Sequence, residues 1–220
     1  MKQQITNNLN GVTVGGNYTG GNSVVNHFYG SSAEVNQIDQ KKNKTNRTIF
    51  LSYNWHDTEI ANRIDKHLSG ISGIIVKRDV RDIGSWKSIR EFMRSIRQQD
   101  YAVLIVSDLY LKSKNCMFEV TEVMKELEYA DRVFPAVVER GIYNPLTRAG
   151  YIQYWQQECS KLEAAIKGLD PANAAELTVD LKCYRNIASS IGEFLSMVAD
   201  RNNPDIQEVE FQIEKALLKN

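Results

Sequence analysis

One carboxylate, Glu119, is of special interest because three polar loops are expected to meet beside it. Each loop directly follows an apolar run of strand length, and the loops span Ser52 to Asn54, Asp79 to Trp86 and Ser107 to Glu119. Parallel α/β sheets bind ligands at the carboxyl ends of their strands, so these loops predict a binding site. A carboxylate fixed beside a sugar can stabilise the positive charge that develops as a bond to the sugar breaks.

Glu119 is expected near the start of a helix that runs from Cys116 to Tyr129. In the first turn of a helix, the positive end of the dipole favours an ionised carboxylate by about 0.3–1 kcal/mol. Glu119, Glu122 and Glu126 also recur at helical spacing, so they can equally form one solvated face opposite the apolar residues. The residues alone leave both interpretations open.

Several familiar catalytic patterns are missing from the sequence. No GxGxxG follows the first expected strand and no GxxxxGK[ST] occurs, which argues against dinucleotide redox chemistry and P-loop hydrolysis. His27, His56 and His67 pair with no serine or cysteine in a recognisable motif, so a hydrolytic triad is not predicted.

The composition is that of an ordinary globular protein. The 220 residues are 42% hydrophobic and 25% charged, and 27 basic side chains balance 27 acidic ones, so nucleic-acid binding is not predicted. Cys116, Cys159 and Cys183 lack disulfide or zinc spacing and are predicted to be reduced, buried thiols, and no metal or other cofactor is expected. Without a signal-peptide core or an apolar run near the roughly 20 residues of a membrane span, we expect a soluble cytoplasmic protein with no membrane partner.

Strands and helices are predicted to alternate, which is typical of a parallel sheet with helices on both faces. Strands are expected over Thr48 to Tyr53, Ile74 to Lys77, Tyr101 to Ser107 and Arg132 to Val138. The continuously apolar third strand is expected at the sheet's centre, whereas Pro135 places the fourth at an edge or irregular position.

The expected helices include one capped by Asp57, one over Trp86 to Gln99 with an apolar stripe through Ile89 and Met93, and three in the C-terminal third. These last three cover Tyr151 to Leu169, Val179 to Asp200 and Asp205 to Leu218. Tyr151, Tyr154 and Trp155 are predicted to be packing aromatics rather than ligand contacts.

The first 33 residues differ from the rest of the chain. No charged residue occurs from Gln3 to Ala33, and Gly-Gly-Asn appears at 15–17 and again at 20–22. Both a stacked cross-β assembly segment and a flexible Gly/Asn-rich tail fit this composition. A polar linker over 34–46, an α/β domain over 47–200 and a C-terminal helix over 201–220 complete the expected organisation.

Three ordered motifs resemble the Toll/interleukin-1 receptor (TIR) domain family. FLSYNWHD resembles the first box of the family, RDVRDIG the loop after the second strand, and SDLYLKSKNCMFEV the Ser-x-x-Cys-x-x-Glu segment of bacterial TIR domains. The resemblance covers roughly Arg47 to Asp200. It implies a flavodoxin-like fold with a five-stranded parallel sheet, although the sequence itself shows no fifth strand.

Enzymatic members of the TIR family cleave NAD+ between nicotinamide and ribose with a glutamate at the position of Glu119. The resemblance therefore implies that NAD+ is the substrate and that the product is ADP-ribose or a cyclised form. The candidate substrate-binding residues are Ser52, Tyr53, Asn54, Asp79, Gly84 and Trp86. Packing at a helix start is the alternative role for Trp86, and loop hydrogen bonding or helix capping is the alternative role for Asp79.

The resemblance also bears on partners and control. Family members complete their sites between neighbouring TIR domains, which implies self-association. The run Val12 to Gly15 resembles the core of amyloid-type signalling motifs, which implies assembly through the N-terminal segment, an upstream sensor with a matching motif and a role in antiphage defence. Asn115 departs from many enzymatic members, which carry tryptophan before the cysteine. A non-catalytic TIR adaptor is therefore the alternative function.

Overall fold

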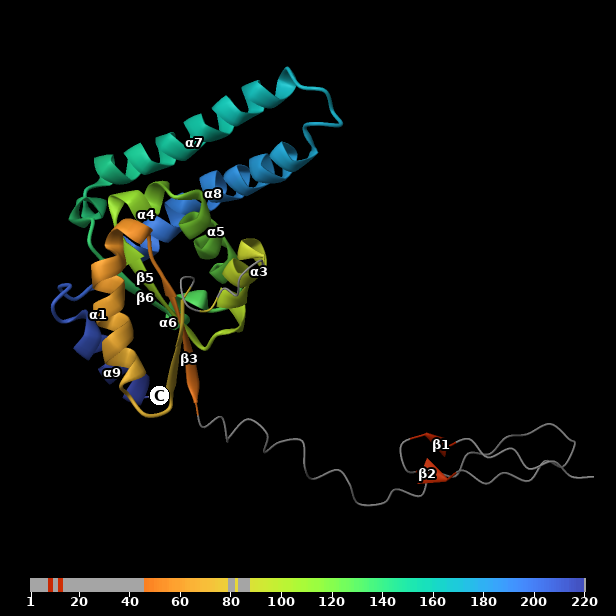
Figure 1. Ribbon diagram of the computed structural model, residues 1–220. Coiled ribbons are helices and arrows are strands. Elements are labelled where there is room, and N and C mark those ends of the chain that lie inside the picture. The colour runs from red at the N-terminus through yellow and green to blue at the C-terminus, as the bar shows by residue number, and fades with distance from the viewer. Residues whose placement is uncertain (1–7, 10–11, 14–45, 79–81, 83–87, 220) are drawn as a thin grey trace, which may run out of the picture. The chain divides into compact units, whose positions relative to one another are not determined.

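The structure, a computed structural model, describes residues 8–9, 12–13, 46–78, 82 and 88–219 (Figure 1). The chain divides into two units, Met1–Asn43 and Lys44–Asn220. In the first unit, the two-residue strands β1 (Asn8–Leu9) and β2 (Val12–Thr13) pair antiparallel. Apart from these strands, the predicted assembly segment lies outside the described residues, as does nearly all of the predicted linker.

The second unit contains a four-stranded parallel sheet. Its strands are β3 (Arg47–Ser52), β4 (Ile74–Lys77), β5 (Tyr101–Val106) and β6 (Val133–Val137), in the order β4-β3-β5-β6. The predicted parallel arrangement is confirmed. β5 is one of two central strands, and β6, which contains Pro135, lies at an edge. This order matches the first four positions of the flavodoxin-like sheet.

The predicted fifth strand is wrong. After β6, the chain forms the 3-10 helix η4 (Arg140–Tyr143) and the helices α7 (Pro145–Lys167), α8 (Ala175–Ala199) and α9 (Val209–Lys219), with no further strand up to residue 219. Local signals favour helix here, because Pro145 occupies the first helical turn and the Asn144 side chain accepts a hydrogen bond from the Leu146 amide at 2.9 Å.

Alternate residues of the strands face two different helical layers. One core joins the sheet to α1 (Thr58–Ser69) and α9, and its strand residues include Ile49, Leu51, Val103 and Ile105. The other core joins the sheet to α5 (Lys114–Val123) and α8 and contains Phe50, Leu104 and Val106. Helices α1 and α9 lie side by side in one layer (Figure 1), and α5 and α8 pack together in the other. The expected helices on both faces of the sheet are therefore confirmed.

Shorter elements connect β4 to β5 and β5 to β6. The first connection contains α3 (Ile89–Arg94) and the 3-10 helix η3 (Ser95–Gln98), and the second contains α4 (Asp108–Lys112), α5 (Lys114–Val123) and α6 (Tyr129–Arg132). A single helix from Cys116 to Tyr129 was expected. Helix α5 instead ends at Val123, and Glu128, which adopts a left-handed conformation with φ 57°, directly precedes the short helix α6.

The long helices α7 and α8 run side by side and extend past the sheet (Figure 1). Trp155 anchors them, since its side chain is buried and its Nε1 donates to the Leu111 carbonyl at 2.8 Å. Tyr154 and Tyr184 meet the Trp155 ring edge-on, each with centroids 5.4 Å apart. The predicted packing role of Tyr151, Tyr154 and Trp155 is confirmed, because Tyr151 and Trp155 belong to the hydrophobic core and Tyr154 packs against it.

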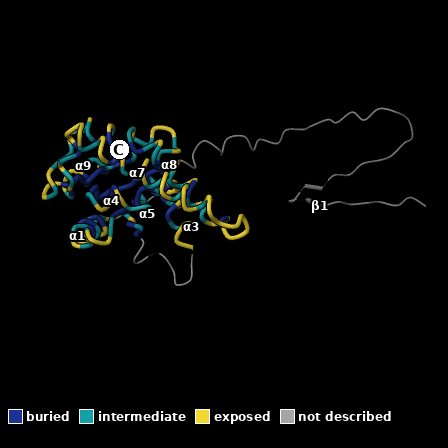
Figure 2. Tube along the Cα trace, turned by 90° about the horizontal axis from the view of Figure 1, so that it is seen from above, coloured by how far each residue is buried: buried dark blue, intermediate teal, exposed yellow. Residues whose placement is uncertain are grey.

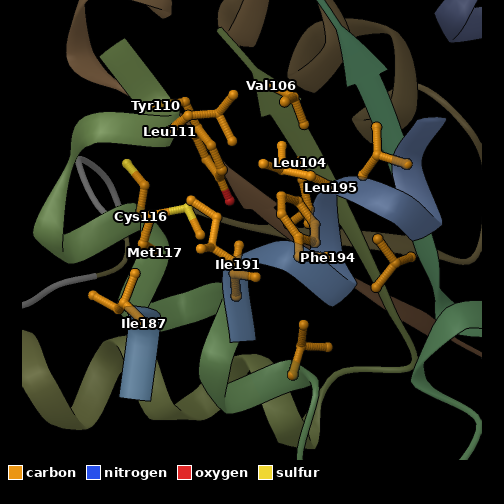
Figure 3. Close-up of a cluster of buried hydrophobic side chains, with 14 of the residues drawn as sticks. Leu104, Val106, Tyr110, Leu111, Cys116, Met117, Ile187, Ile191, Phe194 and Leu195 are labelled. Carbon is orange, nitrogen blue, oxygen red and sulfur yellow. The ribbon is translucent and has the colours of Figure 1, made fainter. Parts of the chain in front are cut away.

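The core beneath the candidate site is formed by α4, α5 and α8. Figure 3 shows Tyr110 and Met117 among side chains of α8, including Ile191 and Phe194. Figure 2 shows buried residues running through the interior of the domain and exposed residues on its outer edges. Among the described helices, none is both long enough and apolar enough to cross a membrane.

Candidate functional site

A cleft of about 350 Å³ lies between the segment after β3, the start of α3 and the first turns of α5. The strand order reverses between β3 and β5, and such a switch point is where open α/β sheets bind ligands. Four lining residues follow β3, two belong to α3, and four belong to α5 or its cap: Tyr53, Asn54, Trp55, His56, Ile89, Met93, Ser113, Asn115, Cys116 and Glu119.

Glu119 is held by a short chain of hydrogen bonds. Its side chain is largely buried, with 7% of the residue exposed, and its Oε2 accepts from the Ser52 hydroxyl at 2.5 Å. The Ser52 Oγ also lies 2.8 Å from the Tyr110 hydroxyl oxygen. A serine hydroxyl has one hydrogen, so Tyr110 donates to Ser52 when Ser52 donates to Glu119. Strand β3 and helices α4 and α5 thus fix the carboxylate together.

Tyr110 keeps its proton at neutral pH. Burial, followed by the charges of Cys116 and Glu119, raises the pKa of the Tyr110 hydroxyl well above its ordinary value of 10.0, against a smaller opposing effect of the Ser52 hydrogen bond. The Tyr110 side chain is fully buried. The hydroxyl therefore keeps the hydrogen that it can donate to Ser52.

The predicted position of Glu119 in the first helical turn is wrong. Helix α5 begins at Lys114, and the Ser113 hydroxyl caps it by accepting from the Cys116 amide at 3.4 Å. Glu119 thus lies in the second turn, where the helix dipole has a weaker effect. The Ser52 hydroxyl of β3 donates a hydrogen bond to this carboxylate.

The solvated-face interpretation of the three glutamates is also wrong. Glu122 is 3% exposed and pairs with Lys125, with 2.5 Å between Oε1 and Nζ. Glu126 pairs with Arg97 at 2.6 Å. Of these three, only Glu119 lines the cleft, so the carboxylates of α5 have separate roles.

Tyr53 lines the cleft from the end of β3. Its hydroxyl accepts from Arg78 Nη2 at 2.6 Å, and the Arg78 guanidinium lies 4.8 Å from the ring centroid. Arg78 is itself buried and also donates to Asn62 and Asp65. These contacts fix the tyrosine ring, which serves as a wall of the cleft.

Asn54 and Asp57 each join the segment after β3 to the segment after β5 by a side-chain hydrogen bond. Asn54 accepts from the His56 amide at 3.1 Å through Oδ1 and donates to the Leu109 carbonyl at 3.2 Å through Nδ2. Asp57 was predicted to cap α1, but its side chain makes no cap bond and accepts from the Ser107 hydroxyl at 2.6 Å. Asn54 therefore shapes the cleft, in addition to lining it.

The structure brings four of the seven predicted site residues together. Glu119, Tyr53 and Asn54 line the cleft, and Ser52 lies directly behind Glu119. Asp79, Gly84 and Trp86 lie outside the described residues, so their predicted roles stay predictions.

Sequence reasoning missed several cleft residues. Trp55 is 73% exposed at the cleft, and its place directly after the first strand was an available signal. Ile89 was assigned to an apolar core stripe, but it is 56% exposed and lines the cleft. Asn115 is exposed beside it. Within the described ranges, no cluster of three or more side chains is suited to hold a metal ion.

Comparison with known families finds a match between residues 49–169, more than half of the chain, and the family described as TIR domain. The matched region includes most of β3, all of β4 to β6, the residues that line the cleft and the whole of α7. The same comparisons find no similar curated protein and no similar solved structure.

Proposed function

This chain belongs to the TIR domain family, and we propose that it is an NAD+ glycohydrolase in which Glu119 is the catalytic residue. The observation that carries the proposal is the buried Glu119 carboxylate, which lines a cleft at the switch point of the sheet and is held by Ser52. Measuring nicotinamide released from NAD+ by the full chain tests the proposal.

The proposed reaction begins with cleavage of the bond between ribose C1′ and the nicotinamide nitrogen. The bonding electron pair passes to that nitrogen and neutralises the ring's positive charge, while the ribose becomes an oxocarbenium ion. The Glu119 carboxylate stabilises this cation by its negative charge. Water then adds to C1′ and releases a proton, which yields ADP-ribose; attack by a nitrogen of the adenine ring would yield a cyclic product.

Ser52 and Tyr110 act as positioning residues in this proposal. Their hydroxyls lie behind the carboxylate and restrict its rotamer, so Glu119 needs little rearrangement as charge develops on the ribose. Tyr53 and the exposed Trp55 provide aromatic surface in the same cleft for the nicotinamide ring.

The Tyr110→Phe substitution should lower kcat for NAD+ cleavage by about two- to tenfold, because it removes one neutral hydrogen bond, whose net free energy corresponds to a factor of that size. KM should change little, because Tyr110 lies behind Glu119 and does not line the cleft. Steady-state kinetics measure both constants. Tyr129→Phe is the matched control, since the Tyr129 hydroxyl donates to Glu193 at 2.9 Å and lies outside the cleft. Equal effects of the two variants would contradict a positioning role.

We further propose that self-association controls the activity, through the TIR surfaces and the N-terminal segment. An NAD+-cleaving enzyme that is always active would harm its own cell. Activity that requires assembly would avoid this harm until assembly is triggered. In this proposal an upstream sensor with a matching motif starts assembly, and the resulting NAD+ loss serves antiphage defence in bacteria.

Deleting Met1–Asn43 should leave a folded domain, because the remaining unit Lys44–Asn220 contains both hydrophobic cores. The protein concentration at which assembly begins should rise at least about tenfold, which corresponds to roughly 1.4 kcal/mol of lost association free energy. Sedimentation velocity measures assembly, and circular dichroism checks the fold. If the shortened chain assembles at the concentration of the full chain, the segment is only a tether.

The alternative is a non-catalytic adaptor that docks onto other TIR domains. Asn115 favours it, because an exposed asparagine stands at the cleft where many enzymatic members carry tryptophan. An adaptor would fold and self-associate normally but release no nicotinamide at any protein concentration.

A further inference from the structure

A second groove, of about 230 Å³, continues from the cleft and lies between α3, α5 and α8. We call it the side groove. It shares Ile89, Met93 and Asn115 with the cleft, so the two hollows meet along these side chains.

The helical spacing of α5 explains how the two hollows are related. Asn115 and Glu119, four residues apart, occupy the helix face that lines the cleft. Lys114 and Phe118 have the same spacing one position earlier, and they line the side groove. A ligand whose reacting atom lies at Glu119 therefore reaches Lys114 by passing Asn115.

Charges in the side groove favour an anionic ligand group. Asp180 of α8 pairs with Arg90 at 3.5 Å and with Lys114 at 3.2 Å. Among the described residues that line the groove, two cations thus share one carboxylate, which leaves a surplus positive charge. All three side chains are at least 30% exposed, so these ion pairs contribute little to stability and can rearrange when a ligand arrives.

The extended shape of NAD+ requires a second binding region beside the cleft. NAD+ consists of a nicotinamide nucleoside and an adenosine joined by a diphosphate, so a nicotinamide ribose at Glu119 leaves an anionic diphosphate and an adenosine to be bound nearby. Arginine and lysine are common diphosphate partners, and carboxylates accept hydrogen bonds from ribose hydroxyls. Phe118, which is half-buried, offers an aromatic surface for a base.

We propose that the side groove is the binding subsite for the adenosine diphosphate half of the dinucleotide substrate, an inference that rests on the proposed function. Arg90 and Lys114 pair with the diphosphate, Asp180 then accepts from the adenosine ribose, and the base lies against Phe118.

Calorimetric titration of the full chain with ADP tests this inference, since ADP carries the adenosine and diphosphate but no bond to be cleaved. The double variant Arg90→Ala/Lys114→Ala should bind ADP about tenfold more weakly than the unsubstituted chain. The control is Arg94→Ala/Lys182→Ala, which removes the same charge from two exposed residues that line neither hollow. It should bind ADP normally. In kinetics, the first double variant should raise KM for NAD+ and leave kcat unchanged.

Three results would overturn the inference: no ADP binding by the unsubstituted chain, equal binding by it and Arg90→Ala/Lys114→Ala, or equal losses in the two double variants. The titration requires no catalysis, so it separates this inference from the proposed function. A chain that binds ADP through Arg90 and Lys114 but never releases nicotinamide would retain the subsite and refute the glycohydrolase.

Discussion

Replacing Glu119 with glutamine should lower kcat for NAD+ cleavage by at least about a hundredfold, the usual effect of removing one preorganised charge-stabilising group. Glutamine has nearly the same size and keeps an oxygen that can accept from Ser52, so the fold and the hydrogen-bond chain should persist. The lost feature is the negative charge opposite the ribose cation. KM should change much less than kcat, because the charge acts mainly in the transition state.

Glu122→Gln is the matched control for this experiment. Glu122 lies on the same helix and is 3% exposed, but it pairs with Lys125 and does not line the cleft. The control variant should keep kcat within about twofold per folded molecule, because distant substitutions act through stability rather than chemistry. Similar losses in Glu119→Gln and Glu122→Gln would show that burial of a charge on α5, and not catalysis, explains the effect.

Replacing Trp155 with alanine should lower the free energy of unfolding by about 3–5 kcal/mol, as expected for truncating a fully buried tryptophan. Trp155 is 1% exposed and contacts Tyr154 and Tyr184 edge-on, so the substitution leaves a large cavity between α7 and α8. It also removes the donor to the Leu111 carbonyl of α4, the helix that carries Tyr110. A domain at the low end of ordinary stability, about 5 kcal/mol, would then be near unfolding.

Urea denaturation of three variants separates the contributions of Trp155. Trp155→Phe keeps a ring but loses the donor, and should cost about 1–3 kcal/mol. Leu146→Ala changes a residue of the same helix that is 81% exposed, and should stay within about 0.5 kcal/mol. If Trp155→Ala costs no more than Leu146→Ala, then α7 and α8 are not part of the domain's cooperative core.

The sequence predicted the sheet well because its signals are local. Each strand is a short apolar run, the long apolar stretch of β5 indicated a central strand, and Pro135 indicated the edge position of β6. Helix ends were less accurate. Residues 125–127 are good helix formers, but α5 ends at Val123, and the chain turns before the short helix α6 and strand β6.

The candidate site was predictable only in part. Glu119 was singled out because it follows the third strand. Its hydrogen-bond partner Ser52 is 67 residues away from it in the sequence, and Tyr110 is 58 residues away from Ser52. No local sequence pattern encodes such pairs. Ile89 matched an apolar stripe that was expected to face the core. It is instead the first residue of the short helix α3, and it lines the cleft. The side groove depends on three helices that meet only after folding.

Nicotinamide release from NAD+, measured for the full chain over a wide range of protein concentrations, tests the central claim most directly. One nicotinamide should be released for each NAD+ consumed, at a rate per molecule that rises as the chain assembles. The Glu119→Gln variant should release almost none. A folded, self-associating chain that releases no nicotinamide at any concentration would contradict the account, as would a Glu119→Gln variant that releases it at the unsubstituted rate.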